Sequence, residues 1–88
     1  MAVQLKVNGP RGEEKIIDLC DDEEQMKRIT VLHLKKKIVH ELQISTYNDV
    51  FLRDPGTQTL EESSLLSVYQ IKHMSTIHTL LMLPGGHL

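Results

Sequence analysis

The sequence predicts one α+β domain in which a mixed β-sheet packs against a single helix, with its elements in the order ββαββ. The chain has 88 residues, enough for one compact domain and too few for two. Apolar and polar residues alternate near the N-terminus, a strongly β-forming run lies near the C-terminus, and apolar residues recur at helical spacing between these stretches. The helix has only one sheet against which to bury its apolar stripe, which gives a β-grasp arrangement.

Composition narrows the classes of function. Hydrophobic residues make up 40% of the chain and charged residues 25%, as in soluble folded proteins. The formal charge of −2 gives no attraction for nucleic acid, and no apolar run approaches the roughly 20 residues that span a bilayer. A single cysteine, Cys20, cannot form an internal disulfide, which is typical of reducing compartments. We therefore expect a monomeric cytoplasmic or nuclear protein with neither nucleic acid nor membrane as a partner.

The first strand and the second form a predicted hairpin. Val3, Leu5 and Val7 alternate with polar residues, which is typical of a strand buried on one face. The turn residues of 9–12 follow, and the β-rich run of 15–19 completes the hairpin.

The middle of the chain contains the predicted helix. The acidic residues 21–24 fit either a solvated loop or the first turn of a helix, where carboxylates offset the helix dipole. Thr30 is a suitable N-cap for a helix that follows it. The spacing of the apolar residues predicts that Lys35 and most of its polar neighbours lie away from the buried stripe. The apolar stripe consists of Val31, Leu34, Ile38 and Leu42.

The C-terminal half supplies the remaining strands. The apolar run 50–52 suits a buried strand, and Asp54-Pro55-Gly56 ends it as a turn. Spaced leucines and Ile71 indicate a short strand and an irregular segment attached to the core. The strongly β-forming run 76–83 is the last strand. We expect Thr76, His78, Leu80 and Met82 on one of its faces and Ile77, Thr79, Leu81 and Leu83 on the other.

Several segments resemble ubiquitin, most clearly Leu66–Ile71, Ser75–His78 and the Gly85-Gly86 pair. The opening strand and residues 31–38 align as well, so the resemblance covers nearly the whole chain. The sequence is therefore identified as a divergent member of the ubiquitin-like protein family, with extra residues between Leu19 and Thr30. The resemblance implies a ubiquitin-like domain over 1–83 and a flexible tail over 84–88.

The resemblance also implies two scaffold contacts. Tyr69 matches a tyrosine whose hydroxyl ties the irregular segment back to a backbone turn. Lys35 and Glu62 match a lysine and a carboxylate that pair between the helix and the following loop.

A patch for binding partners is the first functional feature that the resemblance implies. His78 and Leu80 match a histidine and an apolar residue on the outer face of the sheet, and either Phe51 or Leu52 joins them, depending on the strand register. Such a patch binds the helical domains that recognise ubiquitin. The alternative is that these are scattered surface hydrophobics. Pro10 replaces a patch leucine of the family and Lys6 replaces an aromatic residue, so we expect generic ubiquitin receptors to bind poorly.

The tail is the second implied feature. Gly85 and Gly86 can thread a narrow enzyme tunnel because they have no side chains. In the family, a processing protease exposes the carboxylate of the last glycine, and activating and conjugating enzymes join it to a substrate lysine. This places cleavage after Gly86. Met82 and Pro84 replace arginines, one of which helps to select the activating enzyme, so a distinct activating enzyme is expected.

Two other classes of function are weighed against a modifier. The chain could be a nonconjugated ubiquitin-like interaction domain, in which Gly85-Gly86 begins a linker within a longer protein. An enzyme is disfavoured, because no base with a suitable local motif accompanies Cys20. The histidines lack metal-ligand spacing, so no catalytic residue, metal or cofactor is predicted.

Overall fold

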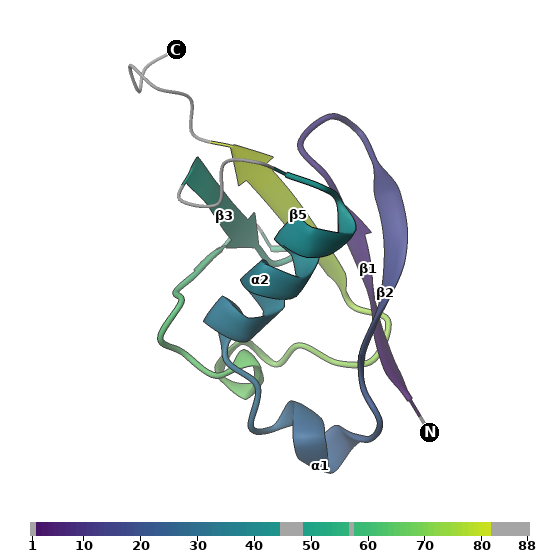
Figure 1. The fold of residues 1–88 in the computed structure, drawn as a ribbon. Helices are drawn as coiled ribbons and strands as arrows, with labels where there is room; N and C mark the ends of the chain where they lie inside the picture. The colour runs from purple at the N-terminus through teal and green to yellow at the C-terminus, as the bar shows by residue number, and fades with distance from the viewer. Residues whose placement is uncertain (1, 45–48, 57, 82–88) are drawn as a thin grey trace.

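The five-stranded sheet and one main helix form a β-grasp fold, which confirms the predicted fold class (Figure 1). The computed structural model describes residues 2–44, 49–56 and 58–81. The strands are β1 (Val3–Asn8), β2 (Glu14–Cys20), β3 (Val50–Arg53), β4 (Thr59–Leu60) and β5 (Thr76–Leu81). The helices are α1 (Glu23–Met26), α2 (Val31–Glu41) and the 3₁₀ helix η2 (Leu66–Tyr69).

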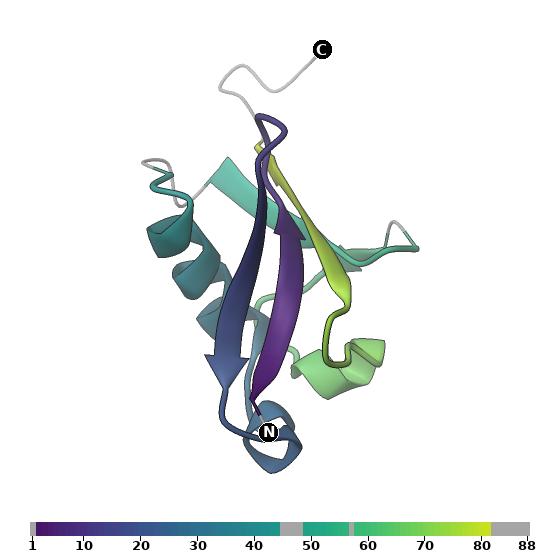
Figure 2. The same ribbon diagram turned by 90° about the vertical axis from the view of Figure 1, so that its right-hand side faces the viewer.

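The sheet is mixed, and its strand order is β2-β1-β5-β3-β4. β1 and β5 are parallel, whereas the pairs β1–β2, β3–β5 and β3–β4 are antiparallel. Figures 1 and 2 show α2 across one face of this sheet. We call this the inner face and the opposite one the outer face.

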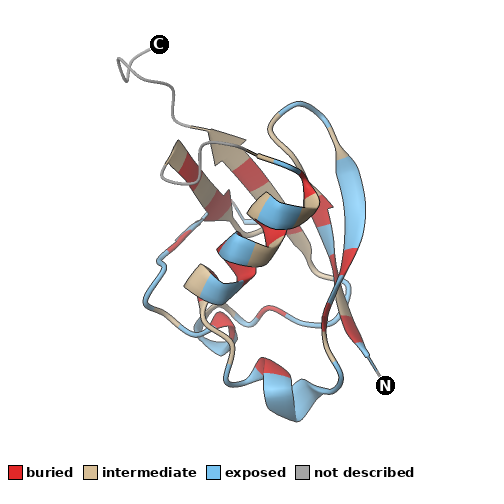
Figure 3. Cartoon of the chain, viewed as in Figure 1, coloured by how far each residue is buried: buried red, intermediate tan, exposed pale blue. Residues whose placement is uncertain are grey.

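The core lies between α2 and the inner face of the sheet, where buried residues meet (Figure 3). Alternation along β1 buries Val3, Leu5 and Val7, as the sequence predicts. From the helix, Leu34 and Ile38 are fully buried. Each strand can therefore present a second, different set of side chains on the outer face.

Both α-helices begin at side-chain caps. Asp22 Oδ1 accepts a hydrogen bond from the Gln25 backbone N–H at 2.9 Å, so the acidic segment is the start of a short helix rather than a loop. Thr30 Oγ1 accepts from the His33 N–H at 3.2 Å, which confirms the predicted N-cap of α2.

Lys35 corrects the helical pattern predicted from sequence, because its side chain is only 4% exposed. It lies one turn after Val31 and at the border of the apolar stripe, where its aliphatic stem can be buried while the ammonium reaches a carboxylate. Its Nζ lies 2.6 Å from Glu62 Oε2, which confirms the pair implied by the resemblance.

The irregular segment between β4 and β5 is held by a second implied contact. The Tyr69 hydroxyl accepts a hydrogen bond from the Glu61 backbone N–H at 3.0 Å. This bond joins η2 to the turn that follows β4, as the resemblance predicts. The two contacts hold this segment and α2 in place within the scaffold.

Candidate functional site

The outer face of β3 and β5 presents a small cluster of apolar and basic side chains. Antiparallel pairing places Phe51 opposite Leu80, and Arg53 opposite His78. All four residues are half-buried. They share one surface because alternate residues of a strand point to the same side. We call these four residues the sheet-face patch.

Of the two residues that the strand register left open, Leu52 is excluded from this patch and Phe51 belongs to it. It is 1% exposed and pairs with Thr79, which is 2% exposed, on the face that packs against α2. Phe51 points to the opposite face, because neighbouring strand residues alternate. The all-apolar run 50–52 has no alternation that could have fixed the register from the sequence.

Arg53 is a patch residue that the sequence analysis missed. Its guanidinium carbon lies 5.6 Å from the centroid of the Phe51 ring, within the range of a cation–π contact. Its Nε is buried and has no hydrogen-bond partner among the residues that the structure describes. The available signal was its position two residues after Phe51, which puts both on the same face once Phe51 is known to point outward.

His78 is oriented by the neighbouring strand. Its Nδ1 lies 3.4 Å from Asn8 Nδ2, across the parallel pairing of β1 and β5. In the tautomer that has its proton on Nε2, Nδ1 accepts a hydrogen bond from the Asn8 amide N–H. In that tautomer Nε2–H is a further donor, on the residue that pairs with Arg53 across β3 and β5.

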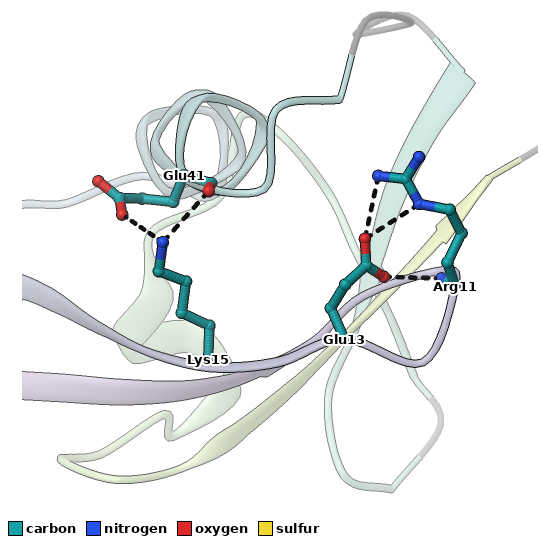
Figure 4. Close-up of polar contacts among 4 residues, drawn as sticks. All are labelled: Arg11, Glu13, Lys15 and Glu41. Carbon is teal, nitrogen blue, oxygen red and sulfur yellow. Dashed lines mark hydrogen bonds and ion pairs between the residues drawn. The ribbon is translucent and has the colours of Figure 1, made fainter.

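The β1–β2 turn follows Asn8, which pairs with His78 of the sheet-face patch. The turn is organised by Glu13 (Figure 4). One oxygen of this carboxylate accepts from the Arg11 backbone N–H at 2.8 Å, and the other lies 3.0 Å from both Nε and Nη2 of Arg11. Hydrogen bonds from the backbone N–H groups of Glu13 and Arg11, helped by the Arg11 side chain, hold the pKa of Glu13 below its ordinary value. Pro10 lies within this cross-linked turn.

Further along β2, Lys15 ties the strand to the end of α2. Figure 4 shows its Nζ between the Glu41 carboxylate at 3.2 Å and the Glu41 carbonyl oxygen at 3.3 Å. A cation at this position also complements the negative end of the helix dipole. We interpret this contact as structural, since it joins two scaffold elements and is remote in sequence from the patch strands.

The predicted tail residues Met82, Pro84, Gly85 and Gly86 lie outside the described residues. The last described residue of β5, Leu81, pairs with Val50 at the start of β3. The tail therefore follows directly in sequence from the strand that carries His78 and Leu80.

Nucleophilic catalysis and metal binding find little support among the residues that the structure describes. Cys20 Sγ donates to the Asp22 carbonyl oxygen at 3.2 Å, and burial raises the pKa of this thiol, which disfavours the reactive thiolate. No group of three or more histidine, cysteine or acidic side chains in residues 2–44, 49–56 and 58–81 could hold a metal ion. Within the same ranges, none of the helices is both long and apolar enough to cross a bilayer.

In comparisons with known proteins, no protein-family model and no curated protein matches the chain.

Proposed function

We propose that this protein is a ubiquitin-like modifier, cleaved after Gly86 and joined through that glycine to substrate lysines. Partners recognise it noncovalently through the sheet-face patch. One observation carries the proposal: the strand that presents His78 and Leu80 on the outer face of a β-grasp sheet leads within a few residues to Gly85-Gly86. A recognition surface and a conjugation tail on one strand suit a protein that is the tag rather than the catalyst.

The proposed chemistry belongs to partner enzymes. A protease hydrolyses the Gly86–His87 peptide bond and leaves a carboxylate on Gly86. An activating enzyme converts this carboxylate to an acyl-adenylate with ATP, releasing pyrophosphate, and an enzyme thiolate then displaces AMP to form a thioester. The amine of a substrate lysine attacks the thioester, releases the thiol and forms an isopeptide bond.

Two residues near the tail bear on which activating enzyme would act on the protein. Met82 and Pro84 occupy positions where ubiquitin has arginines, so we expect an activating enzyme other than that of ubiquitin. The noncovalent partners are expected to be helical domains that dock on the sheet-face patch. We expect such a modifier in the cytoplasm, the nucleus or both.

Cleavage is tested by the intact mass of the protein, which carries an N-terminal tag, after expression in cells of its source and denaturing recovery. Loss of His87 and Leu88 supports the modifier. A protein with an uncut tail contradicts processing and favours the nonconjugated interaction domain.

Conjugation is tested in the same cells by the ladder of high-mass species that carry the tag. Gly86→Ala should abolish the ladder, because a side chain obstructs the enzyme tunnel. Gly56→Ala is a matched control, since an added Cβ would meet only Asp54 Oδ1 at an ordinary 3.5 Å. A ladder unchanged by Gly86→Ala would contradict conjugation through this glycine.

A further inference from the structure

The sheet-face patch consists of two rows with different chemistry. Phe51 and Leu80 form an apolar row across β3 and β5, and Arg53 and His78 form a row of hydrogen-bond donors. The rows are two residues apart along each strand, which corresponds to about 6.6–6.8 Å. A partner that covers the patch therefore meets an apolar group and a cation at a defined separation.

The charge of Arg53 is not neutralised by the part of the chain that the structure describes. The ion pairs found there involve Arg11, Lys15, Lys27 and Lys35 instead. Arg53 contacts the Phe51 ring at 5.6 Å, while its Nε is buried without a hydrogen-bond partner among these residues. A purely apolar partner would bury more of this cation without compensation, which is costly. The patch is thus complementary to a partner that brings its own anion.

A carboxylate matches the donors that are available. A guanidinium presents its N–H groups in a fixed fork that suits a carboxylate, and such charge-assisted bonds are the stronger ones. The Nε2–H of His78 lies on the neighbouring strand and can add a donor from the other side. An Asp or Glu side chain placed between Arg53 and His78 would satisfy both.

The backbone around the patch decides which kind of partner can deliver that carboxylate. β5 lies between β1 and β3, and β3 lies between β5 and β4. Neighbouring strands therefore occupy most of both edges, and a partner strand could extend only the short stretches beyond the β1–β5 and β3–β4 ladders. A helix can lie on the face itself. Side chains three or four residues apart on a helix are about 5–6 Å apart, close to the separation of the two rows.

We propose that the sheet-face patch selects helices that carry an Asp or Glu three or four residues from an apolar side chain. The carboxylate lies between Arg53 and His78, and the apolar group contacts Leu80 and the exposed part of Phe51. This inference rests on the docking role proposed above and specifies the chemistry of the partner. It makes Arg53 the residue that discriminates acidic helices from purely apolar ones.

The test is a selection from a phage-displayed library of helical peptides, randomised on one face, against the full-length immobilised protein. The binding site of the enriched peptides is mapped by amide chemical shifts of the ¹⁵N-labelled protein. We expect shifts centred on Phe51 and Leu80, and an acidic residue three or four positions from an apolar one in the enriched helices.

The best peptide is then synthesised with Gln in place of its acidic residue. Wild-type protein should bind this peptide about tenfold more weakly, the loss of one charge-assisted hydrogen bond. Arg53→Leu should bind both peptides with nearly equal affinity. Arg28→Leu, at an exposed arginine outside the patch, should retain the tenfold preference. Arg53→Lys keeps the positive charge but lacks the forked guanidinium, so it should retain only part of the tenfold preference. It is the second variant if Arg53→Leu does not fold.

Each remaining outcome overturns a different statement. Helices that bind at the patch without an acidic preference would overturn the inference and leave the docking role intact. Enriched helices that shift amides elsewhere, or a library that yields no binder, would overturn the docking role as well. Neither result bears on cleavage after Gly86, which the intact mass decides separately.

Discussion

The two faces of the same sheet are built from alternate residues of the same strands, yet they differ in chemistry. On the inner face, Leu5, Leu52 and Ile77 are at most 1% exposed and pack with α2. On the outer face, Phe51 and Leu80 lie beside Arg53 and His78, and all are half-buried. The difference teaches that the residues of the core and those of the proposed recognition surface are separated by one position along a strand, so single substitutions can address either set.

The largest expected effect on stability is in the core, between α2 and the inner face of the sheet. Leu34→Ala removes a fully buried side chain of α2 and should lower the free energy of unfolding by about 2–5 kcal/mol, through lost burial and a residual cavity. Leu80→Ala, on the outer face, should cost less than about 1 kcal/mol. Urea denaturation of both variants measures the contrast. Equal losses would show that Leu80 is part of the core.

The next effect concerns the charge that is buried in the scaffold. Glu62→Gln weakens the partner of the buried Lys35 ammonium, and we expect a loss of about 1–3 kcal/mol because a buried cation depends on its carboxylate. Half of the Glu62 side chain is exposed, which limits the effect. The adjacent Glu61→Gln is the control and should change stability by at most about 0.5 kcal/mol. A smaller loss for Glu62→Gln than for Glu61→Gln in denaturant titrations would rule out this role.

A smaller effect is expected where the irregular segment is tied to its turn. Tyr69→Phe removes only the hydroxyl that accepts from the Glu61 N–H, so unfolding should become easier by about 1 kcal/mol. Thermal unfolding detects this change, and hydrogen exchange of the Glu61 amide should accelerate. An unchanged exchange rate in the variant would mean that the hydroxyl does not protect this amide.

The smallest effect belongs to the β1–β2 turn and depends on pH. The pKa of Glu13 is lowered by its backbone hydrogen bonds, so the folded state favours the charged carboxylate. Its contribution to stability is therefore present above the ordinary carboxyl pKa of 4.5 and is lost as the pH falls through the lowered value. Glu13→Gln should be less stable than wild type at pH 7, with the gap closing on acidification below about pH 4.5.

The control for the turn is Glu14→Gln, at the exposed neighbouring residue. The free energy of unfolding of wild type, Glu13→Gln and Glu14→Gln is measured from pH 7 to pH 3. A gap between wild type and Glu13→Gln that stays constant over this range would contradict the lowered pKa.

Much of the fold could be predicted because it depends on local patterns. Alternation at Val3, Leu5 and Val7 marked β1, and the spacing of Val31, Leu34 and Ile38 marked α2 with its cap at Thr30. The acidic segment remained ambiguous, because a capped turn and a solvated loop use the same residue types. The Asp22 cap resolves it.

The candidate site was predicted less completely. His78 and Leu80 could be assigned to one face of their strand from alternation alone. Phe51 could not be separated from Leu52, and Arg53 was not recognised, because an all-apolar run gives no face and the register of β3 against β5 joins residues far apart in the chain. The tail positions Gly85 and Gly86 stay predictions from sequence.

The sequence by itself determined which segments are strands and which is the main helix, because side-chain periodicities of 2 and 3.6 are properties of neighbouring residues. Only the tertiary structure decided that Lys35 is buried, that Leu52 belongs to the core, and that Arg53 stands opposite His78. These outcomes depend on how β3, β5, α2 and the loop after β4 meet in space. Contacts between distant segments are fixed by packing and register, which no local pattern encodes.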